Sequence, residues 1–200
     1  MPADTKDRIV EAGADLFQRQ GFTGTGIKQI LTTAHAPFSS LYHFFPGGKD
    51  ELGSEVVRVA GARYQELVEA VFDGAPDIVR GVRDCFAGAA ETLRATDYAD
   101  ACPIATVALE VASVNEPLRV ATAEVFSAWI ESCTRRFRAA GMRPARAREL
   151  AIATINLLEG AFVLSRALRS TEPLAASGAM AVAAVEAELQ AKPRRATARR

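Results

Sequence analysis

The sequence predicts an all-α protein, and three observations support this fold class. Apolar residues recur at helical spacing along most of the chain, and no segment keeps the strict alternation of a half-buried strand. Proline, glycine and capping residues divide the chain into about nine segments of helical length. Hydrophobic residues make up 49% of the 200 residues, so the chain can bury a sizeable core.

The first three predicted helices are short. The first begins near Asp4 or Thr5, either of which can cap it, and ends at Gly21, which tolerates a positive φ. The second follows Thr25, predicted as its N-cap. The third has Pro37 in its first turn, where the missing N–H costs nothing, and ends before the Pro-Gly-Gly turn at 46–48.

Six further helices follow, and most of them are longer. Their expected ranges are about 49–72, 77–95, 103–111, 116–140, 144–168 and 172–191. The chain therefore divides into a three-helix unit at 1–48, a larger helical unit at 49–192 and a basic, disordered tail at 193–200.

The charge is informative in its distribution rather than its total. Twenty-four basic residues balance 24 acidic ones, so the protein is not a uniformly basic nucleic-acid binder. Between Asp15 and Asp50, however, there is no acidic residue. That stretch contains Arg19, Lys28, Lys49 and the two histidines, His35 and His43. It is a candidate DNA-facing segment, although an acid-free stretch of this length also arises by chance.

Residues 25–45 have the form of a helix-turn-helix, in which the second helix enters a major groove. Apolar positions expected to make its internal contacts are Ile27, Ile30, Leu31, Ala34, Leu41 and Phe45. This leaves Phe38, Ser39, Tyr42 and His43 to face outward. Hydroxyls can meet phosphates or base edges, and an aromatic ring can contact a thymine methyl. The alternative is that these aromatic residues pack against neighbouring helices.

Two helix starts in the same region are candidate phosphate sites. Lys49 follows two glycines at the start of the fourth helix, where backbone N–H groups favour an anion. Thr25, at the start of the second helix, is expected to act similarly.

A family resemblance rests on the same residues. The stretch TGTGIKQILTTAHAPFSSLYHFFPGGKDEL, preceded by AGADLFQRQGF, resembles the signature of the tetracycline-repressor (TetR) family of bacterial regulators. CPIATVALEVA resembles the LmrA/YxaF-like branch. The sequence departs from the family pattern at His35, Phe38 and Ser39, which puts the operator sequence in question rather than DNA binding. Histidine tolerates the left-handed conformation, so the turn at His35 is expected to form.

The resemblance implies a cytoplasmic, homodimeric repressor of a palindromic DNA operator, released by a small apolar or aromatic effector. Its DNA contacts are expected at Thr25, Lys28, Phe38, Ser39, Ser40, Tyr42, His43 and Lys49. The alternative is a helical adaptor of the same fold that has lost DNA binding and binds a partner protein instead.

The larger unit is expected to hold the effector and the dimer interface. Candidate pocket residues are Tyr64, Phe86, Leu109, Phe126, Trp129 and Phe162, an apolar and aromatic set. Glu110, Asn156 and Glu159 are candidates for its polar contacts. The eighth helix is apolar nearly all round and the ninth is rich in alanine, as in a four-helix dimer interface. Expected interface residues are Ile155, Leu158, Phe162, Ala179, Met180 and Ala183.

Other classes of protein find little support. No GxSxG, HExxH or P-loop motif occurs, and neither histidine belongs to a Glu-x-x-His pair, so no enzyme, cofactor or metal site is predicted. Cys85, Cys102 and Cys133 are widely spaced and read as buried thiols, with a redox role as the alternative. The N-terminus has no signal-peptide pattern, and no hydrophobic run approaches the ~20 residues needed to span a bilayer, so no membrane partner is expected.

Overall fold

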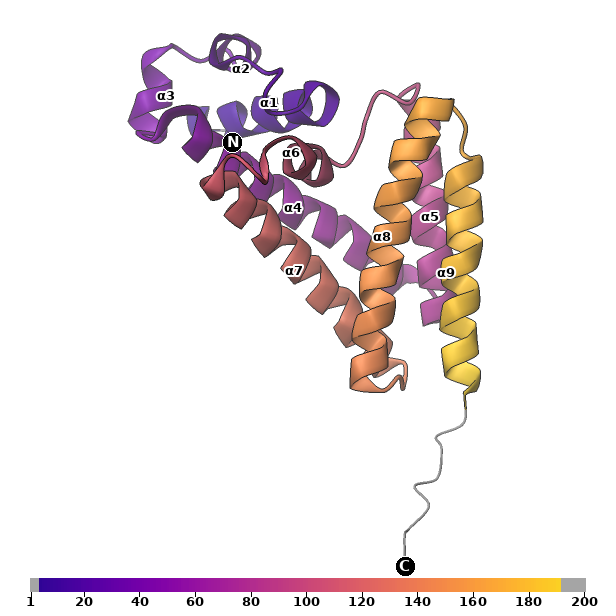
Figure 1. Ribbon diagram of the computed structural model, residues 1–200. Coiled ribbons are helices and arrows are strands. Elements are labelled where there is room, and N and C mark those ends of the chain that lie inside the picture. The colour runs from indigo at the N-terminus through magenta and orange to yellow at the C-terminus, as the bar shows by residue number, and fades with distance from the viewer. Residues whose placement is uncertain (1–3, 192–200) are drawn as a thin grey trace, which may run out of the picture.

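The computed structural model describes residues 4–191, and these fold into nine α-helices with no strand among them (Figure 1). The all-α prediction is confirmed. The helices are α1 (Thr5–Gln20), α2 (Ile27–Thr33), α3 (Ser39–Phe44), α4 (Gly48–Gly74), α5 (Ile78–Ala95), α6 (Pro103–Val111), α7 (Glu116–Ala139), α8 (Pro144–Leu168) and α9 (Glu172–Gln190). The expected tail at 193–200 lies outside the described residues.

Local chemistry explains where the first helices begin and end. Asp4 caps α1 by accepting a hydrogen bond from the backbone N–H of Thr5. Gly21 ends α1 with φ of 74°, and His35 takes a φ of 49° in the turn between α2 and α3, as expected. The prediction that Thr25 caps α2 is wrong. The N-cap is Gly26, which has no side chain, and α2 starts without a side-chain cap.

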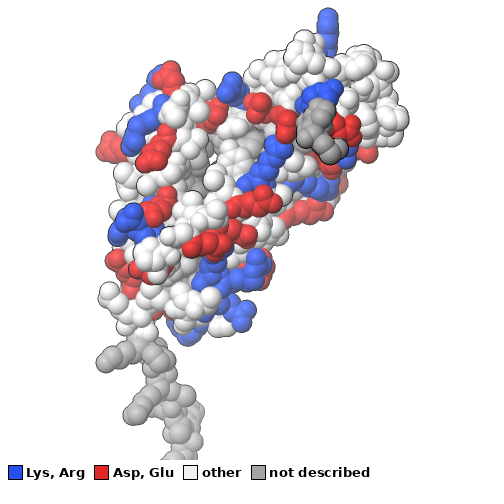
Figure 2. All heavy atoms as spheres, turned by 180° about the vertical axis from the view of Figure 1, so that it is seen from behind, with Lys and Arg blue, Asp and Glu red and all other residues white. Residues whose placement is uncertain are grey.

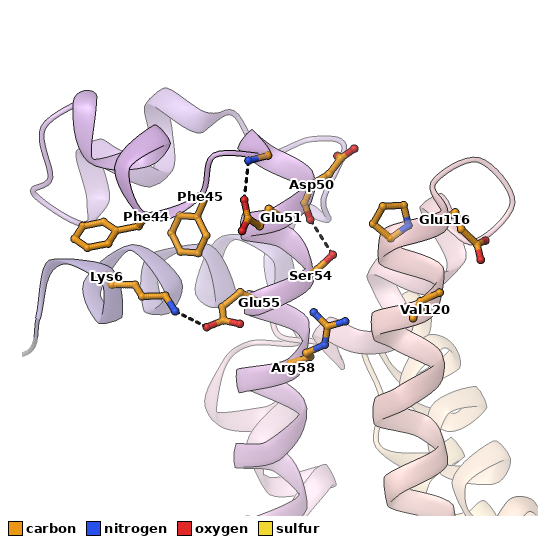
Figure 3. A pocket seen from close by; sticks show the side chains of 12 residues that line it. Lys6, Phe44, Phe45, Asp50, Glu51, Ser54, Glu55, Arg58, Glu116 and Val120 are labelled. Atoms are coloured by element: carbon orange, nitrogen blue, oxygen red, sulfur yellow. Dashed lines mark hydrogen bonds and ion pairs between the residues drawn. The ribbon is translucent and has the colours of Figure 1, made fainter.

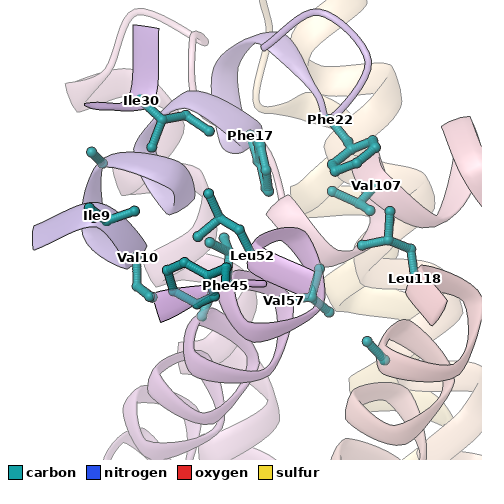
Figure 4. Close-up of a cluster of buried hydrophobic side chains, with 14 of the residues drawn as sticks. Ile9, Val10, Phe17, Phe22, Ile30, Phe45, Leu52, Val57, Val107 and Leu118 are labelled. Carbon is teal, nitrogen blue, oxygen red and sulfur yellow. The ribbon is translucent and has the colours of Figure 1, made fainter. Parts of the chain in front are cut away.

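A first apolar core joins the three N-terminal helices to the larger unit. Phe17 and Phe22 pack edge to face, with ring centroids 5.4 Å apart. Leu52 of α4 and Leu118 of α7 are fully buried in the same cluster (Figure 4). All six residues expected to make the internal helix-turn-helix contacts also pack in it. The N-terminal unit therefore has no core separate from α4, α6 and α7.

A second apolar core holds the other end of the molecule together. It is built mainly by α5, α8 and α9, with the end of α7, which Figure 1 shows side by side. Phe86 of α5 and Phe137 of α7 are buried there, and Gly178 of α9 lets the Phe86 ring approach its backbone. Since α4 and α7 contribute to both ends, they connect the two cores.

Helix α8 differs from a simple core helix. It is long and apolar enough to cross a membrane by length and composition, contrary to the expectation from the sequence, yet it packs against α7 and α9 here. Only 22% of its most apolar window is buried, so much of its apolar surface faces outward in the single chain.

The close approach of α4 and α7 gives a stability prediction. A Cβ at Gly61 would lie 2.4 Å from Val125 Cγ1, so Gly61→Ala forces the two helices apart. We expect the free energy of unfolding to fall by roughly 1–3 kcal/mol. Gly88→Ala, in the middle of α5 with nothing within 4 Å of the new Cβ, is the matched control and should raise it by about 0.5–1 kcal/mol. Urea unfolding measures both, and equal effects would contradict the packing argument.

Candidate nucleic-acid interface and effector region

The outward face of α3 carries an exposed aromatic pair. Phe38 is 61% exposed and Tyr42 is 56% exposed, and their rings meet edge to face at 6.3 Å. Ser39 and His43 are also exposed, and Ser40 is half-buried. Leu41 and Phe45 point the other way, into the first core. The prediction that Phe38, Ser39, Tyr42 and His43 face outward is confirmed. The alternative, that the aromatic residues pack against neighbouring helices, fails for Phe38 and Tyr42. DNA contact by these residues stays a prediction.

Two of the basic residues in the acid-free stretch make contacts within the protein rather than facing solvent as free charges. Arg19 pairs with Asp100 at 3.1 Å. The Lys49 ammonium donates a 2.7 Å hydrogen bond to the carbonyl of Phe22 and lies 4.2 Å from the centre of its ring. Burial lowers the pKa of Lys49. Of these three cations, only Lys28 lies exposed with no ion pair among the described residues.

The structure therefore corrects two predicted phosphate contacts. Lys49 holds the loop between α1 and α2 rather than projecting a free charge. Thr25 is 1% exposed, and its hydroxyl donates to the carbonyl of Gly21 at 2.6 Å, so it cannot meet a phosphate directly in this conformation. The sequence could not separate a cation that faces DNA from one that closes a loop, because both fit an acid-free stretch.

The surface charge agrees with this picture. Figure 2 shows the end that carries the N-terminal helices largely in white, whereas acidic and basic residues mix over the rest of this face. Hydroxyls, aromatic rings and a single lysine, Lys28, dominate the outward surface of α2 and α3, so this surface carries little charge.

Three of the predicted pocket residues come together between α4 and α7. Tyr64 and Trp129 have ring centroids 6.5 Å apart, and Phe126 meets Trp129 edge to face at 5.6 Å. The Trp129 indole donates to the carbonyl of Gly61 at 2.9 Å, and Gln18 of α1 donates to the Tyr64 hydroxyl at 3.1 Å. This aromatic cluster thus touches both the larger unit and the first helix.

A half-buried acid, Glu159 of α8, lies near this cluster. Burial raises the pKa of Glu159 to about 7, and the nearby Cys102 thiol acts in the opposite direction. Burial also raises the pKa of Cys102 well above its ordinary value and the pKa values of Cys85 and Cys133 to about 12. Burial likewise raises the pKa of Tyr64 to about 12. The thiols therefore stay protonated near neutral pH, which disfavours a redox role.

The other three predicted pocket residues lie elsewhere. Phe86 is buried in the second core, and Phe162 packs against that core. Leu109 is 80% exposed on α6. The prediction of one pocket lined by all six is wrong, because helical spacing identifies apolar faces but not which neighbour each face meets.

Two open grooves lie away from the aromatic cluster. One, of about 730 Å³, runs beneath α3 between the start of α4 and the start of α7 (Figure 3). Lys6 pairs with Glu55 inside it at 2.8 Å. Its further carboxylates, Asp50, Glu51 and Glu116, make it unsuited to DNA phosphates. The other groove, of about 530 Å³, lies between α5 and α9 over the buried Leu174.

The α8 residues predicted for the dimer interface are only partly exposed in the single chain. Leu158 and Phe162 pack against the second core, and Ile155 is half-buried. The exposed apolar residues of α8 are Ile152, Val163, Leu164 and Leu168. On α9, Ala179, Met180 and Ala183 are exposed as expected. Leu164 and Leu168 are four residues apart, and Ile152 and Val163 are separated by about three helical turns, but a helix apolar on every side hides this face in the sequence.

Comparison with known proteins gives two family matches. Residues 9–56 match the model for bacterial regulatory proteins of the tetR family, and residues 78–180 match the C-terminal domain of LmrA/YxaF-like transcriptional regulators. YxaF of Bacillus subtilis (strain 168), an uncharacterized HTH-type transcriptional regulator, is 32% identical over 171 residues, 86% of this chain and 90% of YxaF. The HTH-type transcriptional regulator LmrA of the same strain is 29% identical, over 86% of this chain and 91% of LmrA.

Solved structures share the fold. The crystal structure of regulatory protein TetR from Rhodobacter sphaeroides superposes with a TM-score of 0.79 at 22% identity, over 89% of this chain and 97% of that chain. The two chains therefore share the overall fold.

The half-buried Glu159 gives a pH prediction. In the folded protein Glu159 keeps its proton up to about pH 7, whereas its ordinary pKa is 4.5. The folded state binds the extra proton between these values, so the free energy of unfolding falls as pH rises through this window, by about 3 kcal/mol, and levels off above it. Glu159→Gln should lack this decline when urea unfolding is compared at about pH 5 and about pH 8.

Glu131→Gln, an exposed substitution on α7, is the control and should keep the wild-type profile. Equal pH dependence in the wild type and in Glu159→Gln would contradict the assignment.

Proposed function

Because the chain belongs to the TetR family of helix-turn-helix transcriptional regulators, which bind DNA and are not enzymes, we propose that it is a homodimeric repressor released from a palindromic operator by a small effector. The observation that carries this proposal is the exposed face of α3, with Phe38 and Tyr42 standing out from a helix whose other side is buried. Such a face is costly to leave in water and suits a groove.

The DNA contacts follow from the position of each residue. Tyr42 and Ser39 present hydroxyls to phosphates or base edges, and Phe38 presents a ring edge to a thymine methyl. His43 lies beside them at the end of α3, and Ser40 at its half-buried flank. Lys28 on α2 supplies the sequence-independent attraction to phosphate. Thr25 and Lys49 act behind this surface, by fixing the loop that leads into α2.

A dimer supplies the second recognition helix. The exposed apolar face of α8, with the alanine face of α9, would be covered by the same two helices of a second copy about a two-fold axis. Two α3 helices would then reach half-sites about one helical turn, or a multiple of a turn, apart. This covering also accounts for the apolar composition of α8 without a membrane, and DNA as the partner places the protein in the cytoplasm.

The effector site is proposed around the aromatic cluster of Tyr64, Phe126 and Trp129. These rings suit a small apolar or aromatic molecule, and Glu159 beside Cys102 offers it a polar contact. An effector that binds here more tightly when the α3 helices are wrongly spaced must weaken DNA binding, and DNA weakens effector binding by the same factor.

Selection of genomic DNA fragments tests the operator proposal. We expect the purified protein to enrich one palindrome, and Tyr42→Ala to lose the enrichment. Lys28→Ala should instead weaken binding to all fragments and make the dependence of affinity on salt shallower by about one unit per protomer. Arg138→Ala, an exposed cation at the far end of α7, is the matched control for charge. No enrichment at low salt would overturn DNA binding and favour the adaptor.

The dimer proposal has its own test. A double substitution, Val163→Glu and Leu164→Glu, places two charges in the proposed interface and should give a monomer in sedimentation. Leu67→Glu, on α4 with 61% of the leucine exposed, is the control and should stay dimeric. A dimer that survives the double substitution means that another surface mediates association.

A further inference from the structure

One carboxylate of the larger unit bonds directly to the helix-turn-helix. Glu110 lies near the end of α6, and its Oε2 accepts a 2.8 Å hydrogen bond from the backbone N–H of Thr23, in the loop between α1 and α2. That loop decides where α2 begins, because α2 has no side-chain cap of its own. A contact at Thr23 therefore fixes the entry of the helix that carries Lys28.

The chain leaves a specific space for this carboxylate. A Cβ at residue 21 would lie 1.5 Å from Glu110 Oε1, so any residue other than glycine would displace the carboxylate. Gly21 also has a φ of 74° and ψ of 176°, a conformation that only glycine adopts readily. The space for the Glu110 carboxylate and the backbone conformation of residue 21 therefore both require glycine at this position.

Other contacts hold the same loop. Lys49 of α4 donates to the Phe22 carbonyl, and the Thr25 hydroxyl donates to the Gly21 carbonyl. Arg19, just before the loop, pairs with Asp100, which precedes α6. Helix α6 is thereby attached to the N-terminal unit near both of its ends.

The other end of α6 lies at the proposed effector region. Cys102 is the N-cap of α6, and it is buried in the first core, against which Phe126 and Trp129 pack. From residue 102 to residue 110 a helix rises about 12 Å as one rigid piece. A shift at the Cys102 end is therefore carried to Glu110 without a flexible joint between them.

We propose that Glu110 is a positioning residue for DNA binding, which through α6 couples the effector region to the loop that sets the position of α2 and α3. The carboxylate does not touch DNA. It holds the Thr23 amide, and displacement of α6 withdraws that support. The inference rests on DNA binding by α3 as proposed above, but it requires no knowledge of the effector.

The test compares three full-length variants by amide hydrogen exchange and by affinity for the selected operator fragment. In Glu110→Ala, exchange at Thr23 and along α2 should rise roughly tenfold, and operator affinity should fall by roughly three- to tenfold. Glu110→Gln keeps an acceptor oxygen and should restore most of both. Glu124→Ala is the matched control, since it removes an exposed carboxylate that pairs with Arg58 at 2.8 Å, away from the loop.

Each outcome is decisive. If Glu110→Ala behaves as Glu124→Ala does, the positioning role is wrong. If exchange rises equally in the second core, around Phe137, Glu110 is a general stabilising residue and the proposal fails. If the wild type selects no operator, the proposed function fails, while exchange at Thr23 still shows whether Glu110 fixes the loop.

Discussion

The first apolar core is the constraint on which the rest of the structure depends. It places Phe17 and Phe22 of the N-terminal unit against Leu52 of α4 and Leu118 of α7. Gly53 allows this packing, because a Cβ there would lie 2.7 Å from the Phe22 ring. The helix-turn-helix therefore cannot reorient without disturbing α4, α6 and α7, and its orientation is set by the larger unit.

Polar contacts to the loop between α1 and α2 add a defined direction to the position that the first core gives the N-terminal helices. A buried apolar cluster fixes position broadly, since apolar packing has no preferred direction. Hydrogen bonds have direction, and those from Lys49 and Glu110 to the loop at residues 21–25 specify how α2 leaves α1. A regulator needs both properties, because recognition of two half-sites depends on the angle of α3 as well as on its location.

The fold was largely predictable from the sequence, and the site only in part. Proline, glycine and capping residues act locally, so the end of α1 at Gly21 and the starts of α5 at Asp77 and α8 at Pro144 follow from neighbouring residues alone. The outward face of α3 also followed from helical periodicity. Lys49 and Thr25 could not be placed, because their partners, the carbonyls of Phe22 and Gly21, become available only once the loop has folded.

The errors in the larger unit have the same origin. Phe86 and Leu109 are both apolar residues at helical spacing, yet one is in the second core and the other faces solvent. Helix α8 is apolar on every side, so periodicity could not show which side it exposes. Tertiary packing decides such cases, and a single sequence contains no direct record of it.

The central claim is that the N-terminal helices and the larger unit share one core and open together. Native-state hydrogen exchange of the full-length protein tests it directly, by comparing the opening free energies of amides around Ile9 in α1, Val56 in α4 and Leu118 in α7. The account predicts one common value for all three regions. A distinctly lower value confined to α1, α2 and α3 would mean that the helix-turn-helix opens as an independent unit, and would contradict it.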